Sequence, residues 1–260
     1  MHYKVSKMLR LSSNLFPLAK ASLLSLMLAM AGCADWPAAA GVPASRAAGT
    51  CESGLSATDN TRLAGVEQLL GDGKPYAALA QLDALKLSSP QVDLLRADAL
   101  RRIDRDQEAI QAYKRLEGTC IDGRAQHGLG LIAAKAGRKA ESLQYFQKAR
   151  QALPVDTRVR NDLGYGLLLI GQYDAAQFEF LTVLDLNPGD NRASRNLVLL
   201  TMLRGQQDKA LELARQLGLD ATAVSQLKNQ AESLRTVSGE RPPDQMGSMN
   251  TPTPTKPIKP

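Results

Sequence analysis

Few residues of this 260-residue chain have side chains suited to catalysis or metal binding, and they are widely spaced. There are two histidines, His2 and His127, and three cysteines, Cys33, Cys51 and Cys120. No cysteine or paired carboxylate stands at metal-ligand spacing from His127, and the sequence has no phosphate loop, serine elbow or CxxC motif. Three cysteines do not complete a four-ligand zinc site. We therefore expect no enzyme, no metal, no cofactor and no small-molecule substrate, with His127 simply solvated or hydrogen-bonded.

Three arginines stand out by their spacing rather than their number. Arg124, Arg158 and Arg192 follow one another at intervals of 34 residues. The planar guanidinium of arginine pairs with carboxylates through two parallel hydrogen bonds. The series therefore predicts a site for acidic groups, unless the three residues are only the solvated starts of helices.

The N-terminus resembles a bacterial lipoprotein signal. Residues 1–32 contain basic residues and no acid, followed by the apolar run ASLLSLMLAMA and then Gly32-Cys33. That run is shorter than the ~20 apolar residues that a membrane-spanning helix needs. The resemblance to a lipobox implies acylation of Cys33, removal of His2 with the signal, and anchoring at the periplasmic face of the outer membrane. The alternative is a simple secretory signal in which Cys33 has no role.

Removal of the signal changes the charge. The whole chain has a formal net charge of +6, and four of its basic residues (Lys4, Lys7, Arg10 and Lys20) lie in the signal, which leaves +2. A basic excess that would favour nucleic acid is therefore lost, and we expect no nucleic-acid partner.

Two cysteines, Cys51 and Cys120, remain for the oxidising periplasm. A disulfide between them would close a long loop and stabilise the fold by about 4 kcal/mol in the entropic model. We predict this disulfide; the alternative is two independent thiols.

The spacing of 34 residues recurs throughout the middle of the chain and indicates an internal repeat. It relates Pro154 to Pro188, as well as the pairs Leu129 and Leu163, Gly130 and Gly164, Gly137 and Gly171, and Phe146 and Phe180. In residues 157–190 the pattern predicts a helix near Arg158–Ile170, a left-handed cap at Gly171, and a second helix near Tyr173–Leu186 that stops before Pro188.

This pattern resembles the tetratricopeptide repeat. The residues at signature positions are Leu163, Gly164, Leu167, Tyr173, Ala176, Phe180 and Pro188. The resemblance implies an all-α fold, a right-handed superhelical solenoid of antiparallel helix pairs. We expect a tether at 33–58, four to five repeats over 59–220 (best at 123–156 and 157–190), a capping helix at 221–237 begun by Asp220, and a disordered proline-rich tail at 238–260.

In tetratricopeptide domains the first helix of each repeat lines a concave groove that binds peptides. The resemblance thus implies that the three arginines form a ladder in this groove, for a partner with acidic groups or a free carboxyl terminus. The residues expected to line the groove are Arg124, His127, Arg158, Asn161, Tyr165, Arg192, Arg195 and Asn196.

Residues 90–220 look most like TadD, the lipoprotein of the Flp (tight-adherence) pilus apparatus, notably in RNDLGYGLLLIGQYDAAQFEFLTVLDLNPGDNRASRNLVLL. This resemblance implies a non-enzymatic pilotin whose protein partner is the outer-membrane secretin or another pilus assembly component. Two alternatives stay open: a pilotin of type IV pili, and a periplasmic scaffold for envelope or peptidoglycan enzymes.

Overall fold

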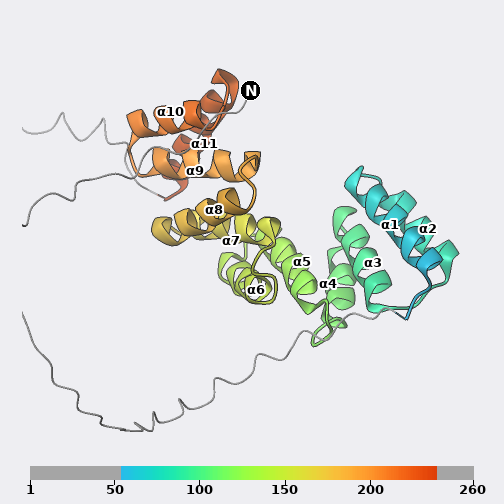
Figure 1. Cartoon of the computed structure of the whole chain (residues 1–260). Coiled ribbons are helices and arrows are strands. Elements are labelled where there is room, and N and C mark those ends of the chain that lie inside the picture. The colour runs from blue at the N-terminus through green and yellow to red at the C-terminus, as the bar shows by residue number, and fades with distance from the viewer. Residues whose placement is uncertain (1–53, 239–260) are drawn as a thin grey trace, which may run out of the picture. The chain divides into compact units, whose positions relative to one another are not determined.

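The structure is a computed structural model that describes residues 54–238, and these residues form eleven helices. The fold is all-α, as predicted, and every regular element of the described residues is a helix (Figure 1). None of these helices has the length and apolar character needed to cross a membrane. The helices are α1 (Ala57–Gly71), α2 (Pro75–Leu85), α3 (Pro90–Arg102), α4 (Asp106–Lys114), α5 (Asp122–Lys135), α6 (Lys139–Ala152), α7 (Thr157–Leu169), α8 (Tyr173–Leu186), α9 (Asn191–Leu203), α10 (Gln207–Gln216) and α11 (Ala221–Ser238).

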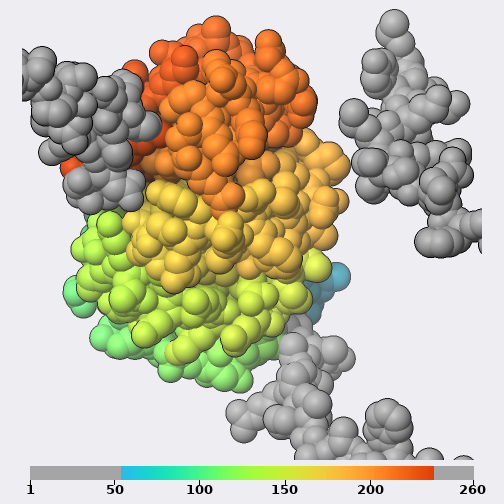
Figure 2. Space-filling model, turned by 90° about the vertical axis from the view of Figure 1, so that its left-hand side faces the viewer, coloured from blue at the N-terminus to red at the C-terminus, as the bar shows by residue number. Residues whose placement is uncertain are grey.

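The helices pair into hairpins that stack in chain order. Each odd-numbered helix from α1 to α9 packs against the helix that follows it, and the second helix of each hairpin packs against the first helix of the next. Successive hairpins therefore form successive layers, which Figure 2 shows as bands of changing colour. Helix α1 also contacts α3, α3 contacts α5, and α7 contacts α9, while a hydrogen bond between His127 and Asp162 joins α5 to α7. The outward residues of these first helices therefore share one face.

The helix boundaries agree with the predicted signals. In the best repeat, α7 and α8 begin and end within one residue of the predicted limits. Gly137, Gly171 and Gly205 end the first helices of three hairpins with φ of 73°, 76° and 76°, a conformation that costs glycine little. Asp220 accepts a hydrogen bond from the backbone N–H of Ala223 at 2.7 Å and caps α11 as expected.

Close contact between the two helices of a hairpin depends on glycine. A Cβ added to Gly130 would lie 2.5 Å from the ring of Phe146, and one added to Gly164 would lie 2.6 Å from the ring of Phe180. Both aromatic rings are buried. The glycine–phenylalanine contact is the physical basis of two of the 34-residue series.

A buried ion-pair network links α6, α7 and α8. Glu179 on α8 accepts a hydrogen bond at 2.6 Å from Arg160 on α7, and Arg150 on α6 lies 3.6 Å from its other carboxylate oxygen. Arg160 also donates to the backbone oxygen of Pro154 at 2.5 Å. Glu179 and Arg160 are both buried. If one of them is removed, water therefore cannot take its place beside the other charge.

We predict that Gly164→Ala destabilises the fold, because its methyl group would overlap the ring of Phe180. Overpacking costs about 1–3 kcal/mol, partly offset by the better helix propensity of alanine. Urea unfolding followed by circular dichroism measures the difference. Gly71→Ala is the control, since Gly71 is helical and meets nothing within 4 Å; it should be neutral or slightly stabilising. Equal behaviour of the two variants would contradict the packing argument.

We also predict that Glu179→Gln lowers the free energy of unfolding by about 3 kcal/mol, because it leaves the buried Arg160 without a counter-charge. The matched control is Glu141→Gln, which breaks the exposed pair with Arg138 and should cost less than about 1 kcal/mol. The same urea midpoints test both. A loss for Glu179→Gln no larger than for the control would show that the buried pair adds nothing.

Candidate functional site

Three of the predicted groove arginines line one pocket. Arg124 on α5, Arg158 on α7 and Arg192 on α9 surround a cavity of about 270 Å³ together with His127. The arginine ladder is thus a spatial cluster built by three consecutive first helices. We call this cavity the basic pocket; its lining residues are Asp98, Arg101, Arg102, Arg124, His127, Gly128, Leu131, Leu153, Asp156, Arg158, Val159, Asp162 and Arg192.

Five arginines and three aspartates line the basic pocket, so its formal charge is positive with His127 neutral. The arginines differ in how far they are already engaged. Arg102 donates to the backbone oxygen of Leu70 at 2.6 Å, whereas Arg124 has only a 3.7 Å ion pair with Glu67. Arg192 is exposed and makes no hydrogen bond or ion pair with any residue of the described range. Arg124 and Arg192 are therefore the two guanidinium groups best placed to receive an anionic group.

Arg158 is held in place by the N-cap of its own helix. Asp156 accepts hydrogen bonds from the backbone N–H groups of Arg158 and Val159, and from the Arg158 side chain at 2.9 Å and 3.3 Å. Burial by itself would raise the pKa of Asp156, but the hydrogen bond and charge of Arg158 outweigh it and the pKa is lowered. The hydrogen bond to Asp156 raises the pKa of Arg158 in turn.

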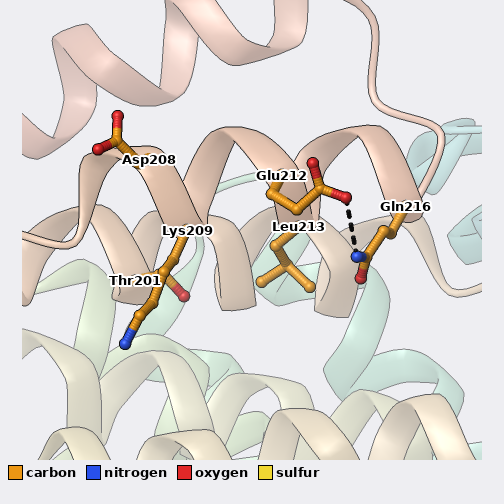
Figure 3. A pocket seen from close by; sticks show the side chains of 6 residues that line it. All are labelled: Thr201, Asp208, Lys209, Glu212, Leu213 and Gln216. Carbon is orange, nitrogen blue, oxygen red and sulfur yellow. Dashed lines mark hydrogen bonds between the residues drawn. The ribbon is translucent and has the colours of Figure 1, made fainter. Parts of the chain in front are cut away.

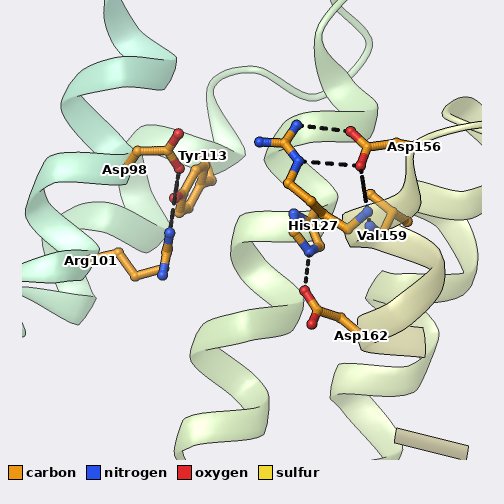
Figure 4. A network of polar contacts seen from close by, with 8 residues as sticks. Asp98, Arg101, Tyr113, His127, Asp156, Val159 and Asp162 are labelled. Carbon is orange, nitrogen blue, oxygen red and sulfur yellow. Dashed lines mark hydrogen bonds and ion pairs between the residues drawn. The ribbon is translucent and has the colours of Figure 1, made fainter. Parts of the chain in front are cut away.

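A second polar cluster closes the pocket on the α3 side. The hydroxyl of the buried Tyr113 donates to Asp98 at 2.5 Å, and the Nε of Arg101 donates to the same hydroxyl at 3.2 Å (Figure 4). Burial and the neighbouring Asp98 raise the pKa of Tyr113, which keeps its proton in place. Burial alone would lower the pKa of Arg101, but Tyr113 and Asp98 reverse this and raise it. Arg101 therefore carries a fixed positive charge.

His127 is hydrogen-bonded, which is one of the two environments predicted for it. Its Nε2 lies 2.7 Å from a carboxylate oxygen of Asp162 on α7, and its ring lies 5.8 Å from that of Phe146 (Figure 4). The pair spans two first helices and orients both side chains toward the pocket. No group of three or more histidine, cysteine or acidic residues in residues 54–238 is arranged to hold a metal ion.

The other predicted groove residues lie outside the basic pocket. Asn161 is buried and accepts a hydrogen bond from the amide of Asn196 at 3.0 Å. Tyr165 accepts one from Gln230 on α11 at 3.2 Å, and Arg195 donates to Gln226 on the same helix at 2.9 Å. Both α11 contacts involve residues expected to face the groove, so α11 lies over the first helices α7 and α9.

Sequence reasoning missed five charged members of the pocket. Asp156 and Asp162 could have been found from the sequence, because the repeat places each first helix beside the next and so brings residues at a fixed offset together. The hydrogen-bonded pairs His127–Asp162 and Asn161–Asn196 share an offset of 35 residues, one more than the repeat. Asp98, Arg101 and Arg102 lie on α3, in the repeat of residues 90–122, which is one residue shorter than the period of 34. No series of 34 therefore points to them.

The predicted covalent sites involve residues outside the described range. Cys120 is disulfide-bonded, but Cys33 and Cys51 both lie outside residues 54–238. The Cys51–Cys120 pairing and the lipidation of Cys33 stay predictions.

A larger cavity of about 500 Å³ lies beside α10. It is lined by side chains of both charges, and Gln216 there donates to Glu212 at 3.0 Å (Figure 3). Its lining residues are Thr201, Asp208, Lys209, Glu212, Leu213 and Gln216. Because the charges of Asp208, Lys209 and Glu212 partly cancel, this cavity selects less strongly for a charged ligand than the basic pocket does.

Comparison with known proteins identifies relatives of this chain. A family model described as tetratricopeptide repeat matches residues 121–157. TPR repeat-containing protein PA4299 of Pseudomonas aeruginosa is 34% identical over 183 residues, which cover 70% of this chain and 74% of that protein. Aspartyl/asparaginyl beta-hydroxylase of Mus musculus is 40% identical over 57 residues, but these are only 22% of this chain and 8% of that enzyme.

Similar solved structures were also found. MamA AMB-1 is 19% identical with a TM-score of 0.47, and the match covers 62% of this chain and 98% of that one. YrrB, described as a TPR protein with an unusual peptide-binding site, is 21% identical with a TM-score of 0.47, over 66% of this chain and 90% of that one.

We predict that Asp156→Asn weakens the fold in a pH-dependent way. The lowered pKa of Asp156 means that its charge stabilises the native state above the pKa of the unfolded chain, and that this contribution is lost as the pH falls through the folded pKa. The variant should be less stable than the natural chain at pH 7, by roughly 1 kcal/mol, and the gap should be smaller at pH 3, below the ordinary pKa of 3.8.

Urea midpoints at the two pH values measure this gap. Asp190→Asn, at the N-cap of α9, is the control because Asp190 accepts from Ala193 but forms no ion pair with an arginine of residues 54–238. A gap that is as large at pH 3 as at pH 7 would rule out the charge of Asp156 as its cause.

Proposed function

Because the chain belongs to the tetratricopeptide-repeat protein family, we propose that it is a non-enzymatic interaction scaffold in Flp (tight-adherence) pilus assembly. In this role it acts as a pilotin that assists the localisation or multimerisation of the outer-membrane secretin. The general part of this proposal, a protein that binds other proteins, follows from the family and the fold. The pilus assignment is supported by the TadD-like sequence of residues 90–220.

The basic pocket is the observation that carries the proposal. Its lining residues come from four first helices and from the segment before α7, so one bound segment would contact several repeats at once. The uncommitted Arg192 and the weakly paired Arg124 present the two-pronged geometry that carboxylates prefer. The partner segment accordingly carries an acidic group or a free carboxyl terminus at the pocket.

The cellular location proposed with this function is the periplasmic face of the outer membrane, through acyl chains on Cys33. An anchored scaffold would bring the bound secretin to the membrane in which the secretin multimer forms. The segment between Cys33 and α1 is rich in alanine, glycine and proline, a composition typical of a tether.

We predict that the triple variant Arg124→Glu, Arg158→Glu and Arg192→Glu fails to bind the Flp secretin. Reversing three charges replaces attraction for an acidic segment with repulsion, and binding in pull-downs should fall at least tenfold. In a strain lacking the natural gene, the variant should leave secretin multimers as depleted in the outer-membrane fraction as the deletion does.

The matched control is Arg62→Glu, Arg138→Glu and Arg215→Glu, which changes the charge equally at exposed arginines outside the pocket. Circular dichroism establishes that both variants fold. Unchanged secretin multimers in the deletion strain would overturn the pilotin proposal. Loss of type IV pilus secretin multimers instead, or co-purification with peptidoglycan hydrolases without a piliation defect, would favour the respective alternative.

A further inference from the structure

The outer face of α8 exposes an apolar pair that the hairpin packing does not use. Phe178 is 62% exposed and Leu181 is 43% exposed, and they lie three residues apart on one side of the helix. Leu186 at the end of α8 is 45% exposed. Phenylalanine is among the residues most often buried, and neighbouring exposed apolar side chains can mark an interaction site.

The neighbouring repeats show that this face has no structural need of apolar residues. One repeat earlier, the positions of Phe178 and Leu181 are occupied by Gln144 and Gln147 on α6, which are exposed. One repeat later they are occupied by Glu212 and Arg215 on α10, also exposed. The apolar pair is therefore specific to α8.

Acids flank the apolar pair at both ends. Asp174 lies four residues before Phe178 and Asp185 four residues after Leu181, so all four share one helix face. Helix α8 contains three acids and no lysine or arginine. Glu179 is buried against Arg160, and Asp174 accepts a hydrogen bond from Arg204 at 2.5 Å. Asp185 is exposed and has no hydrogen-bond or ion-pair partner among residues 54–238, so the surface around the apolar pair keeps a net negative charge even with Arg204 beside Asp174. We call Asp174, Phe178, Leu181 and Asp185 the α8 face.

We propose that the last six residues of the chain, TKPIKP, dock on the α8 face. In this segment Lys256 and Lys259 flank Ile258, and no acid follows Asp244. The alternation of base and apolar residue matches the acid–apolar–acid order of α8. Proline-rich segments bind to exposed aromatic side chains at little cost in conformational entropy, because their backbone is already restricted.

The tail is long enough to reach α8. Lys256 lies 18 residues beyond Ser238, the last residue of α11, which allows an extended span of roughly 55 Å. Helix α11 packs on α9, and α9 packs on α8. Two helix layers correspond to about 20 Å, well within that span.

Charge argues against a second copy of the chain as the occupant of the α8 face, and the side chains of the two cavities beside α10 argue against these cavities as sites for the tail. Stacking α8 of two copies against each other would oppose acids in either orientation, which is repulsive. The crevice of about 630 Å³ between α10 and α11 is lined by Arg215 and Lys228 against one acid, Asp208, so its net positive charge disfavours a lysine-bearing tail. The cavity of Figure 3 is lined by two acids and one lysine, but it offers no aromatic ring to the prolines of the tail, whereas α8 does.

The test places a photo-crosslinker in the tail of the full chain, with Ile258→p-benzoylphenylalanine. After irradiation, mass spectrometry should find the p-benzoylphenylalanine at position 258 joined to the α8 peptide of the same molecule. Adding Phe178→Gln and Leu181→Gln, which gives α8 the residues of α6 at these positions, should lower the yield at least fivefold without loss of helicity. Asp174→Asn with Asp185→Asn, or 0.5 M salt, should lower it to a smaller extent.

Tyr76→Gln is the control, since Tyr76 on α2 is 73% exposed and lies in another hairpin; the yield should not change. Crosslinks to another part of the chain, crosslinks between two copies, or an unchanged yield in the glutamine variant would each overturn the proposal.

Discussion

The contact between glycine on one helix and an aromatic ring on another sets the distance between helices on which the rest of the structure depends. Inside two hairpins the pairs are Gly130 with Phe146 and Gly164 with Phe180. Between hairpins, a Cβ on Gly128 of α5 would lie 2.2 Å from the ring of Tyr113 on α4. Because the ring of Tyr113 fits there, its hydroxyl reaches Asp98 and Arg101. A packing constraint thus positions one wall of the basic pocket.

Helix α11 divides the face of the first helices into two parts. Its apolar residues Leu227 and Ala231 are buried in the same core as α9, while its glutamines contact Tyr165 and Arg195. A helix that only capped the stack would pack equally on α10, yet an apolar crevice separates α10 from α11. The part of the face around Tyr165 and Arg195 is therefore already covered by α11, whereas the basic pocket stays open to a ligand.

Much of the fold could be predicted from the sequence, because the residues that fix a helical hairpin recur at one spacing. Leucine, glycine and phenylalanine series gave the limits of α7 and α8 to within one residue, and Gly171 gave the left-handed turn between them. The direction of α11 could not be predicted in this way. Its apolar positions, Val224, Leu227, Ala231 and Leu234, define a buried face, but helix periodicity does not say which neighbour that face meets.

The candidate site was predicted only in part, for a related physical reason. A repeat spacing identifies residues at equivalent positions, and it correctly brought Arg124, Arg158 and Arg192 to one cavity. It does not identify contacts between positions that differ. Arg101 and Arg102 lie at the end of α3, in a repeat one residue short, where Asp104 takes the left-handed φ of 62° that glycine has in later repeats.

Residues that are 35 positions apart face each other between successive first helices, and the chemistry of these facing pairs differs along the array. Between α5 and α7 the facing pair is His127 and Asp162, and between α7 and α9 it is Asn161 and Asn196. The first pair is ionisable and borders the basic pocket, whereas the second is neutral and has a buried member. Hydrogen bonds between amides hold α7 against α9 without adding charge, so the electrostatic preference is concentrated at the α5–α7 step. A solenoid of similar repeats can in this way bind a charged group at one position while its scaffold stays uniform.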